Sequence, residues 1–360
     1  MRRTAALIVG GGPAGSAAAI DLARAGVEAE LVERTEGPHD TVCGGFLGWD
    51  ALAAIERLGL DPAALGARPI GRLRLISAER SLEVDLPRAA AGLSRRTLDE
   101  ALLEAAQRAG AVVRRGRTVR AAELAERRVR LDNEGWLAGD ALVLATGKHE
   151  LRGGARPVDI STRPLGLRVS LKPSRALRGS LDGTIELHLY DGGYAGLLLQ
   201  DDGTANLCLS ASRDRLKEAG GIEPLVERLA CELPAFGGRL GQGEAGAWSA
   251  VSGVPYGWRA DSTAEGVYRV GDQASVIASL AGDGIAIALE SGMAAARAIA
   301  GGVPAADFQR DWARRARRPI GLAELLRRSA ENAMARQAMM GLLGWFPSLA
   351  PLAARLTRIG

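Results

Sequence analysis

Residues 5–15 read Ala-Ala-Leu-Ile-Val-Gly-Gly-Gly-Pro-Ala-Gly, so a continuous apolar run ends in a glycine-rich turn. The apolar run predicts a buried parallel strand. The Ala-rich segment from Pro13 to Ala25 predicts a helix that Gly26 ends, and a second strand is expected from Glu28 to Val32. Together these segments form one βαβ unit, which places the chain in the α/β class.

Gly10, Gly12 and Gly15 have the spacing Gly-x-Gly-x-x-Gly, and Glu33 follows at the end of the next predicted strand. In such a strand–turn–helix the first glycine permits a tight turn, the second leaves room for a pyrophosphate, and the third lets the helix approach the strand. The helix N-terminus offers free N–H groups to phosphates, and Glu33 can accept ribose hydroxyls. The context therefore predicts a Rossmann-type dinucleotide site rather than an unrelated turn.

The same glycine spacing recurs at residues 241–246. No apolar strand precedes it, and the segment after it does not begin like a helix. We therefore expect one dinucleotide site and no separate nicotinamide domain.

A second pattern is Gly271-Asp272 after a predicted strand, followed by Gly282-Asp283-Gly284 at the start of a helix expected to end near Ala300. Many FAD enzymes hold the ribityl chain and the ring in this way. Asp272 would hydrogen-bond a ribityl hydroxyl. The helix N-terminus would face the flavin N1/C2=O edge, where reduced flavin carries negative charge. The pattern predicts FAD rather than NAD.

These motifs resemble those of the geranylgeranyl reductase flavoproteins and their relatives among aromatic hydroxylases of the p-hydroxybenzoate hydroxylase type. The resemblance spans roughly residues 5–300 and rests on Gly10–Gly15, Glu33-Arg34, Val42–Gly45, Ser94–Asp99, Ala145–Gly147, Gly271–Gln273 and Gly282–Gly284. A bacterial subgroup linked to polyketide or lipid tailoring is similar in Tyr194–Leu197, Asn206, Cys208 and Val254–Gly257.

The resemblance also implies which residues bind FAD. Arg95 would reach the pyrophosphate or ribityl region, and Cys43-Gly44-Gly45 would lie near the isoalloxazine ring. The electron donor stays open, with NAD(P)H as the transient candidate. The complete set expected to contact the cofactor is Gly10, Gly12, Pro13, Ala14, Gly15, Glu33, Arg34, Cys43, Gly44, Gly45, Arg95, Thr146, Gly147, Asp272, Gly282, Gly284 and Ile285.

Two departures from related families bear on the reaction. The Trp-x-Trp-x-Ile-Pro motif of tryptophan halogenases is absent, which disfavours halogenation. The Asp-Gly segment by which many hydroxylases contact flavin and NADPH is replaced by Ala145–His149, which disfavours NADPH-dependent hydroxylation.

Three functions stay open from the sequence. The first expectation is a monooxygenase that hydroxylates an aromatic or polyketide-like lipophilic substrate. The alternative is an FAD-dependent reductase or dehydrogenase of C=C bonds in an isoprenoid or lipid substrate. A non-catalytic flavin-binding protein is the remote third.

The candidates for a catalytic role are Cys43, His188 and Tyr256, and none is a clear catalytic base. Cys43 could equally be a small buried residue. His188 and Tyr190 alternate with leucines on a predicted strand, so we expect them to share a sheet face that lines the substrate pocket. Tyr256 belongs to an aromatic-rich segment, Trp248–Trp258, expected to complete that wall.

The domain organisation follows from where these patterns fall. A Rossmann-type FAD domain would be discontinuous, a second lobe would carry an antiparallel sheet and hold the substrate, and C-terminal helices would cover one side. The expected segments are 1–70, 93–160 and 262–302 for the FAD domain, 71–92 and 161–261 for the second lobe, and 303–360 for the helices.

Composition limits the partners and the location. The net charge is 46 − 42 = +4, with Arg scattered along the chain, so no nucleic-acid partner is expected. The three cysteines form no Cys-x-x-Cys pair and no zinc-type cluster, so we expect no metal and a reduced, cytoplasmic setting. Peripheral membrane contact stays open, because Arg327, Arg328, Arg336 and Arg355 flank the apolar stretch Met339–Leu352.

Overall fold

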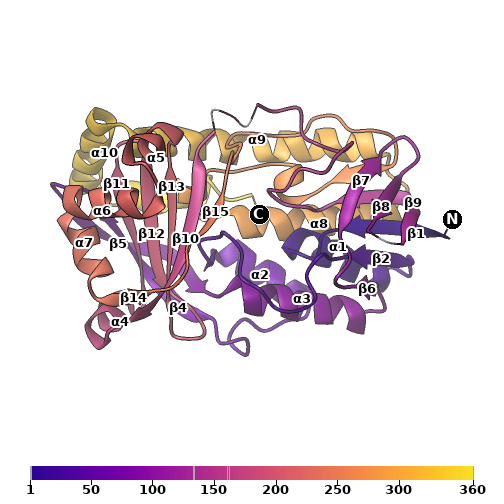
Figure 1. The fold of residues 1–360 in the computed structure, drawn as a ribbon, viewed down its shortest axis with the longest axis horizontal. Helices are drawn as coiled ribbons and strands as arrows, with labels where there is room; N and C mark the ends of the chain where they lie inside the picture. Colours follow the sequence, from indigo (N-terminus) through magenta and orange to yellow (C-terminus); the bar gives the residue numbers. More distant parts are fainter. Residues whose placement is uncertain (1, 133, 160, 162, 360) are drawn as a thin grey trace.

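Two sheets, one in each lobe of an elongated molecule, organise the chain in this computed structural model (Figure 1). The structure describes residues 2–132, 134–159, 161 and 163–359. The first sheet has the strand order β6-β2-β1-β9-β8-β7, and β16 pairs with β9. Its strands are β1 (Arg2–Val9), β2 (Ala29–Val32), β6 (Val112–Arg114), β7 (Val119–Glu123), β8 (Arg128–Leu131), β9 (Gly135–Leu144) and β16 (Val267–Arg269).

The parallel part of this sheet is the predicted βαβ unit. β1 lies between β2 and β9 and is parallel to both, and each of its residues from Ala6 to Val9 pairs on both sides. A central strand of a parallel sheet is buried on both faces. Its residues are therefore apolar without alternation. The predicted α/β fold class is confirmed.

Four helices accompany the first sheet: α1 (Pro13–Arg24), α2 (Trp49–Arg57), α3 (Arg95–Arg108) and α8 (Gly284–Ala300). Both α1 and α8 are built from small residues, which lets their backbones approach closely. A Cβ added at Gly292 of α8 would lie 2.1 Å from the carbonyl oxygen of Ala14 in α1. This contact joins the two ends of the predicted cofactor site, since α1 follows the first glycine motif and α8 follows the last.

The second sheet has the order β14-β10-β13-β12-β11-β4-β5-β3, with β15 beside β10. Most of its neighbouring strands are antiparallel, as expected for the second lobe. Its strands are β3 (Phe46–Leu47), β4 (Arg68–Ile76), β5 (Ser81–Gly92), β10 (Leu165–Pro173), β11 (Thr184–Tyr190), β12 (Gly193–Leu199), β13 (Ala205–Ala211), β14 (Gly243–Ala245) and β15 (Ser249–Val251).

Helices cover one face of the second sheet, and the sequence did not predict them. They are α4 (Arg175–Leu181), α5 (Arg213–Ala219), α6 (Ile222–Glu232) and α7 (Pro234–Leu240). Leu225 and Leu229 of α6 and Phe236 of α7 are buried against apolar side chains of β10, β12 and β13. The opposite face of the sheet is consequently free to form a wall of the site.

Three C-terminal helices complete the fold: α9 (Ala305–Glu331), α10 (Ala333–Trp345) and α11 (Leu349–Leu356). In Figure 1, α9 runs along the molecule from the first lobe to the second, and α10 lies at the far end of the second lobe. Arg336 fixes the junction of α9 and α10, since it donates to the Ala330 carbonyl and pairs with Asp191. In the described part of the chain, no helix combines the length and apolar character needed to cross a membrane.

Candidate active site

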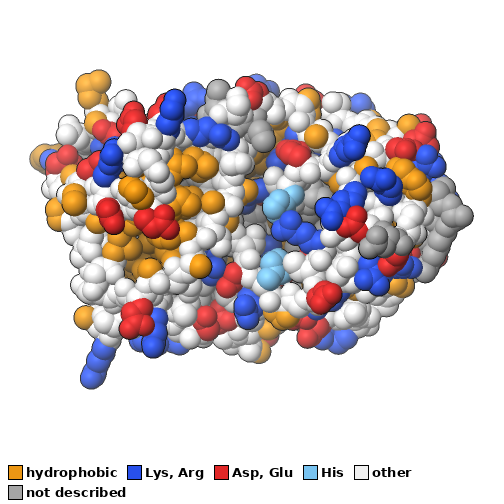
Figure 2. Space-filling model, viewed as in Figure 1, with side chains coloured by type: hydrophobic (Ala, Val, Ile, Leu, Met, Phe, Trp, Pro, Cys, Tyr) orange, Lys and Arg blue, Asp and Glu red, His pale blue; other side chains and the backbone are white. Residues whose placement is uncertain are grey.

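One cavity of about 900 Å³ connects the glycine-rich turn of the first lobe with the second sheet and the C-terminal helices. Figure 2 shows the hollow between the lobes, with Lys, Arg and His side chains gathered around it. All the residues expected to bind the cofactor line this cavity except Gly15. Gly15 has a packing role instead, because a Cβ there would lie 1.9 Å from the Gly10 carbonyl oxygen.

The glycine-rich turn leaves an open, uncapped helix end in the cavity. Gly10 has φ 108°, and its Cβ would lie 2.5 Å from the Ala145 oxygen, so only glycine fits there. Gly12 is the N-cap of α1 and provides no side-chain cap. The nearest atom to a Cβ at Gly12 would be Nη2 of Arg95, at 3.4 Å. The space beside Gly12 is therefore bounded by a cation and a helix N-terminus, which suits a pyrophosphate.

Glu33 lies at the end of β2 and is held by backbone donors. Its Oε2 accepts from the Gly11 N–H at 2.7 Å, and its Oε1 accepts from the backbone N–H and the hydroxyl of Thr35 at 2.9 and 2.8 Å. Nearby, Nη2 of Arg34 lies 3.0 Å from Nε2 of His149. Burial, followed by the charge of Arg34, lowers the pKa of His149. A neutral His149 and the anionic Glu33 thus border the part of the cavity expected to hold adenosine.

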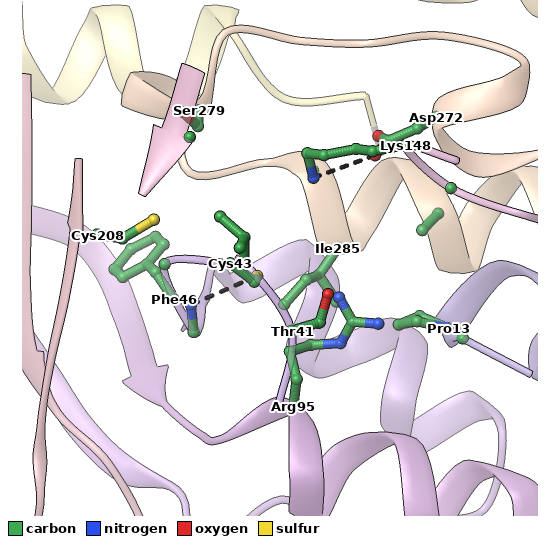
Figure 3. A pocket seen from close by; sticks show the side chains of 18 of the residues that line it. Pro13, Thr41, Cys43, Phe46, Arg95, Lys148, Cys208, Asp272, Ser279 and Ile285 are labelled. Atoms are coloured by element: carbon green, nitrogen blue, oxygen red, sulfur yellow. Dashed lines mark hydrogen bonds and ion pairs between the residues drawn. The ribbon is translucent and has the colours of Figure 1, made fainter. Parts of the chain in front are cut away.

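Arg95 is oriented by Asp99, one helical turn further along α3. Its Nε and Nη2 donate to the two Asp99 carboxylate oxygens at 2.7 and 2.6 Å. Burial lowers the pKa of Arg95, but the Asp99 carboxylate outweighs it and the net shift is upward. The guanidinium also interacts with the Cys43 thiol. Arg95 is therefore a fixed cation between the helix end at Pro13 and the Cys43 segment, as Figure 3 shows.

A second cation, Lys148, lies on the opposite side of the cavity in Figure 3 and pairs with Asp272 at 3.2 Å between Nζ and Oδ2. The Asp272 carboxylate raises the pKa of Lys148. Arg156 donates to the Asp272 carbonyl at 2.8 Å and so fixes that segment. Lys148 belongs to the segment that departs from the hydroxylase pattern. Its ion-pair partner Asp272 lies more than a hundred residues away in sequence, so no local signal predicts the pair.

Asn206 of β13 holds the Cys43 segment against the second sheet. Its Nδ2 donates to the carbonyl oxygens of Cys43 and Gly44 at 3.0 and 2.8 Å, while its Oδ1 accepts from Arg168 at 2.7 Å. Cys208, two residues further along the same strand, also lines the cavity. Burial raises the pKa of Cys208 to about 12, so this thiol stays protonated at neutral pH.

Where the cavity becomes apolar, three hydroxyl groups form a hydrogen-bonded cluster. The Tyr256 hydroxyl lies 2.7 Å from Oγ of Ser279 and 3.5 Å from the Tyr194 hydroxyl, which also contacts Ser279. Burial raises the pKa of Tyr194 well above its usual value. Tyr256 thus lines the cavity as expected, while Tyr194 and Ser279 join it through contacts that the sequence does not reveal.

The expectation that His188 and Tyr190 line the substrate pocket is wrong. His188 is fully buried on the other face of β11, where its Nε2 lies 3.2 Å from Glu186 and its ring packs on Phe236. Tyr190 donates to the Ser210 carbonyl on that face. Leu187 and Leu189, which alternate with them, face the cavity instead. The alternation was recognised correctly, but this pocket wall is apolar and the polar residues lie beneath α4–α7.

Residues 3–135 match the model of an FAD binding domain. The chain is 27% identical to a menaquinone reductase of Mycolicibacterium smegmatis over 86% of its own length and 79% of the relative's. It is equally similar to a menaquinone reductase of Mycobacterium tuberculosis, over 98% of its length and 88% of the relative's. The chain is an FAD-dependent oxidoreductase.

Solved structures share the fold of this oxidoreductase. The flavin-dependent brominase Bmp2 has a TM-score of 0.80 at 18% identity, covering 99% of this chain and 93% of Bmp2. PqsL, a probable FAD-dependent monooxygenase from Pseudomonas aeruginosa, has 0.70 at 19%, covering 94% and 100%. A geranylgeranyl bacteriochlorophyll reductase-like protein from Thermoplasma acidophilum has 0.69 at 20%, covering 87% and 82%. The resemblance predicted from the motifs is confirmed.

The cavity of the oxidoreductase fits FAD at both ends of the cofactor. The uncapped N-terminus of α1 and Arg95 offer donors to a pyrophosphate, and Gly12 leaves the space free. At the other end, Gly282, Gly284 and Ile285 bring the N-terminus of α8 to the cavity, and Asp283 forms no side-chain cap there. Bound FAD supplies two-electron redox chemistry, and the protein positions the substrate and excludes water.

Proposed function

We propose that this oxidoreductase reduces a C=C bond in a lipophilic substrate that carries an isoprenoid chain, such as a lipid quinone. The observation that carries the proposal is the apolar part of the cavity, which is lined by residues of the second sheet and the C-terminal helices rather than by those expected to bind FAD. Its walls come from β4, β11 and β12 on one side and from α10 and α11 on the other. Apolar residues that line it are Leu73, Leu75, Ile185, Leu187, Leu189, Leu198, Met339, Leu343, Leu349, Ala350 and Ala353.

This cavity suits a hydrocarbon chain for two reasons. Aliphatic side chains from two separate layers bury apolar surface on both sides of the substrate, at about 25 cal/mol for each Å² removed from water. Among the described residues of β4, β11, β12, α10 and α11 that line the cavity, none is charged, so a chain bound between them meets no unpaired charge.

Saturation of a C=C bond adds two hydrogen atoms, one as the hydride that reduced FAD would supply and the other as a proton. The Tyr256 hydroxyl is placed to donate it, since it lines the cavity where the polar and apolar regions meet. Ser279 and Tyr194 can return a proton to Tyr256 through the hydrogen bonds of the cluster. Cys43 is the second candidate proton donor, because it lines the cavity and Asn206 fixes its backbone.

The curated relatives support a lipid quinone as the substrate. Both are named menaquinone reductases, and their similarity to this chain extends over 86% and 98% of its length. Hydroxylation of an aromatic or polyketide-like substrate, with NAD(P)H as donor, is the second candidate. It is favoured by the fold shared with PqsL and by the apolar wall, which would keep water from the ring. The segment Ala145–His149 weighs against it, since it replaces the Asp-Gly segment by which many hydroxylases contact flavin and NADPH.

One experiment separates these candidates. The FAD-loaded protein is reduced with dithionite without oxygen, mixed with a menaquinone of short isoprenoid chain, and the product is analysed by mass spectrometry. A product heavier by two hydrogen atoms, with a saturated chain bond, is expected. A product heavier by one oxygen atom, formed only after air is admitted, would overturn the proposal in favour of hydroxylation. NADH and NADPH are compared in parallel by the bleaching of the flavin absorption band.

A further inference from the structure

The C-terminal helices carry an unusual exposed surface. The described part of the chain has nine large hydrophobic side chains that are exposed, and six of them belong to residues 333–356. Trp345 is 84% exposed and Phe346 58%, both where α10 ends. Figure 2 shows hydrophobic side chains projecting at the end of the second lobe, where α10 lies. Apolar side chains gathered in this way on a surface mark a contact with another molecule.

α11 is apolar on two opposite faces. Ala350, Ala353 and Ala354 follow the helical repeat and line the cavity. Leu352 and Leu356 lie on the opposite face and are 49% and 55% exposed. A helix that is apolar on both faces is normally covered on both. The inner face of α11 is covered by the protein, so the outer face requires a partner that accepts leucine side chains.

The charged residues within this segment of the chain have one sign. No Asp or Glu occurs from residue 332 to 360, and the segment contains three arginines. Arg336 pairs with Asp191 and Arg358 with Asp283. Arg355 has no ion-pair partner among the residues that the structure describes, and neither has Arg88 of β5. These two arginines border the same shallow hollow beside α11. Unpaired cations next to exposed leucines suit an apolar layer that has anionic headgroups.

The outer surface and the cavity also meet. Leu342 of α10 is 51% exposed and at the same time lines the cavity, one turn from Met339 and beside Leu343. The two helices therefore separate the apolar cavity from the surroundings by a single layer of side chains. A lipid reaching the site past Leu342 would cross no polar region.

We propose that α10, α11 and the turn between them dock on an anionic lipid bilayer and that the substrate enters the cavity from the bilayer past Leu342. Trp345, Phe346, Leu352 and Leu356 enter the apolar layer. Arg88 and Arg355 contact headgroup phosphates. The substrate route rests on the proposed function, whereas the docking surface rests only on exposure and charge. Of the four arginines that the sequence singled out, Arg327 and Arg328 pair with acidic residues of α9, and Arg355 alone stays available.

Vesicle co-sedimentation tests the docking surface without any turnover. The FAD-loaded protein is mixed with phosphatidylcholine vesicles with and without phosphatidylglycerol, and binding is expected to be stronger by about tenfold or more with the anionic lipid. The double variant Trp345→Ser/Phe346→Ser should lose about tenfold or more in affinity for both kinds of vesicle. Arg88→Glu/Arg355→Glu should lose the preference for phosphatidylglycerol.

The matched control is Val303→Ser. Val303 is an exposed apolar residue, 38% accessible, and α9 separates it from α10 by about 40 Å. Its replacement should leave vesicle binding unchanged. Equal vesicle binding by the control and the double variant would overturn the proposal. So would a dimer in sedimentation velocity that the double variant converts to a monomer, because the surface would then be covered by a second copy.

Two further measurements keep folding and the proposed function separate from docking. Flavin absorbance and circular dichroism report whether the double variant is folded. Trp345→Phe keeps the apolar area, and its fluorescence should be quenched less by brominated lipids than that of the wild type. Reduction of a water-dispersed short-chain quinone should be unchanged in the double variant, while reduction of vesicle-embedded menaquinone should fall about tenfold or more. Vesicle binding without any quinone reduction would leave the docking surface standing and refute the proposed function.

Discussion

Arg358 at the C-terminus is joined to Asp283 at the N-terminus of α8, with 2.8 Å between Nη1 and Oδ1. The Ile359 backbone N–H donates to the other carboxylate oxygen at 3.2 Å. Asp283 belongs to the segment expected to face the flavin ring, and Arg358 lies two residues beyond the end of α11. The helices that cover the substrate cavity are therefore fixed to the cofactor site by a buried ion pair.

Replacement of Arg358 by Ala should destabilise the protein and weaken FAD retention together. The change leaves Asp283 buried without its cation, and above about pH 7, where this carboxyl is ionised, the loss is on the order of 3–5 kcal/mol for a pair of this kind. Arg355→Ala is the matched control, because it removes an exposed arginine three residues away that has no ion-pair partner among the described residues. Urea unfolding and the flavin content after gel filtration measure both effects. Equal free energies of unfolding for the two variants would show that the ion pair does not contribute to stability.

Asp283 also predicts a dependence of stability on pH. Burial, opposed by Arg358, raises the pKa of Asp283 from 3.8 to about 7. Between these values the folded protein binds the proton that the unfolded chain releases, so this contribution to stability is complete below about pH 4 and is lost as pH rises through 7. Its size is on the order of 4 kcal/mol.

Asp283→Asn keeps the neutral form of the side chain at every pH. The free energy of unfolding of this variant, measured in urea between about pH 5 and pH 8, should therefore fall less with rising pH than that of the wild type. Parallel slopes for the two proteins would contradict the raised pKa.

The two glycines at the start of α1 should respond differently to a side chain. Gly12→Val is expected to fold, since a Cβ there meets only Arg95 at 3.4 Å, but to bind little FAD because the branched side chain occupies the pyrophosphate space. Gly15→Val should fail to fold, because its Cβ would lie 1.9 Å from a carbonyl oxygen. Circular dichroism separates these outcomes from flavin content. A Gly12→Val protein that retains full flavin would place the pyrophosphate elsewhere.

The parts of the site that could be predicted from sequence are those set by local backbone geometry. Gly10, Gly12 and Gly284 mark turns and helix ends, and short-range spacing is enough to recognise them. The pairs Lys148–Asp272 and Arg358–Asp283 join segments about 75 to 125 residues apart and leave no local pattern. For His188 the strand period was clear, but period alone does not say which face of the sheet meets the cavity.

The polar face of β11 points away from the cavity for a reason that the sequence does not show. Burying Glu186 and His188 is costly unless both are paired, and the residues that pair with Glu186, Arg74 and Arg239, come from β4 and α7. Those partners are distant in sequence, so the polar residues looked available for a pocket. The helices α4–α7 are short, and the strand pattern around them does not reveal them.

The last prediction concerns Tyr256 as the proton donor. Tyr256→Phe removes the hydroxyl that lies 2.7 Å from Ser279 but keeps the ring under Arg327, so packing and FAD content should be unchanged. If Tyr256 protonates the substrate carbon, the rate of reoxidation of the reduced flavin by substrate should fall by about 10²–10⁴. Reduction of the flavin by dithionite does not use this proton and should keep its rate.

His188→Ala is the contrasting variant: it should lower stability, because Glu186 loses a buried partner, with little effect on reoxidation in the protein that remains folded. If Tyr256→Phe reoxidises at the wild-type rate, the proton comes from elsewhere, and Cys43→Ala becomes the variant to measure.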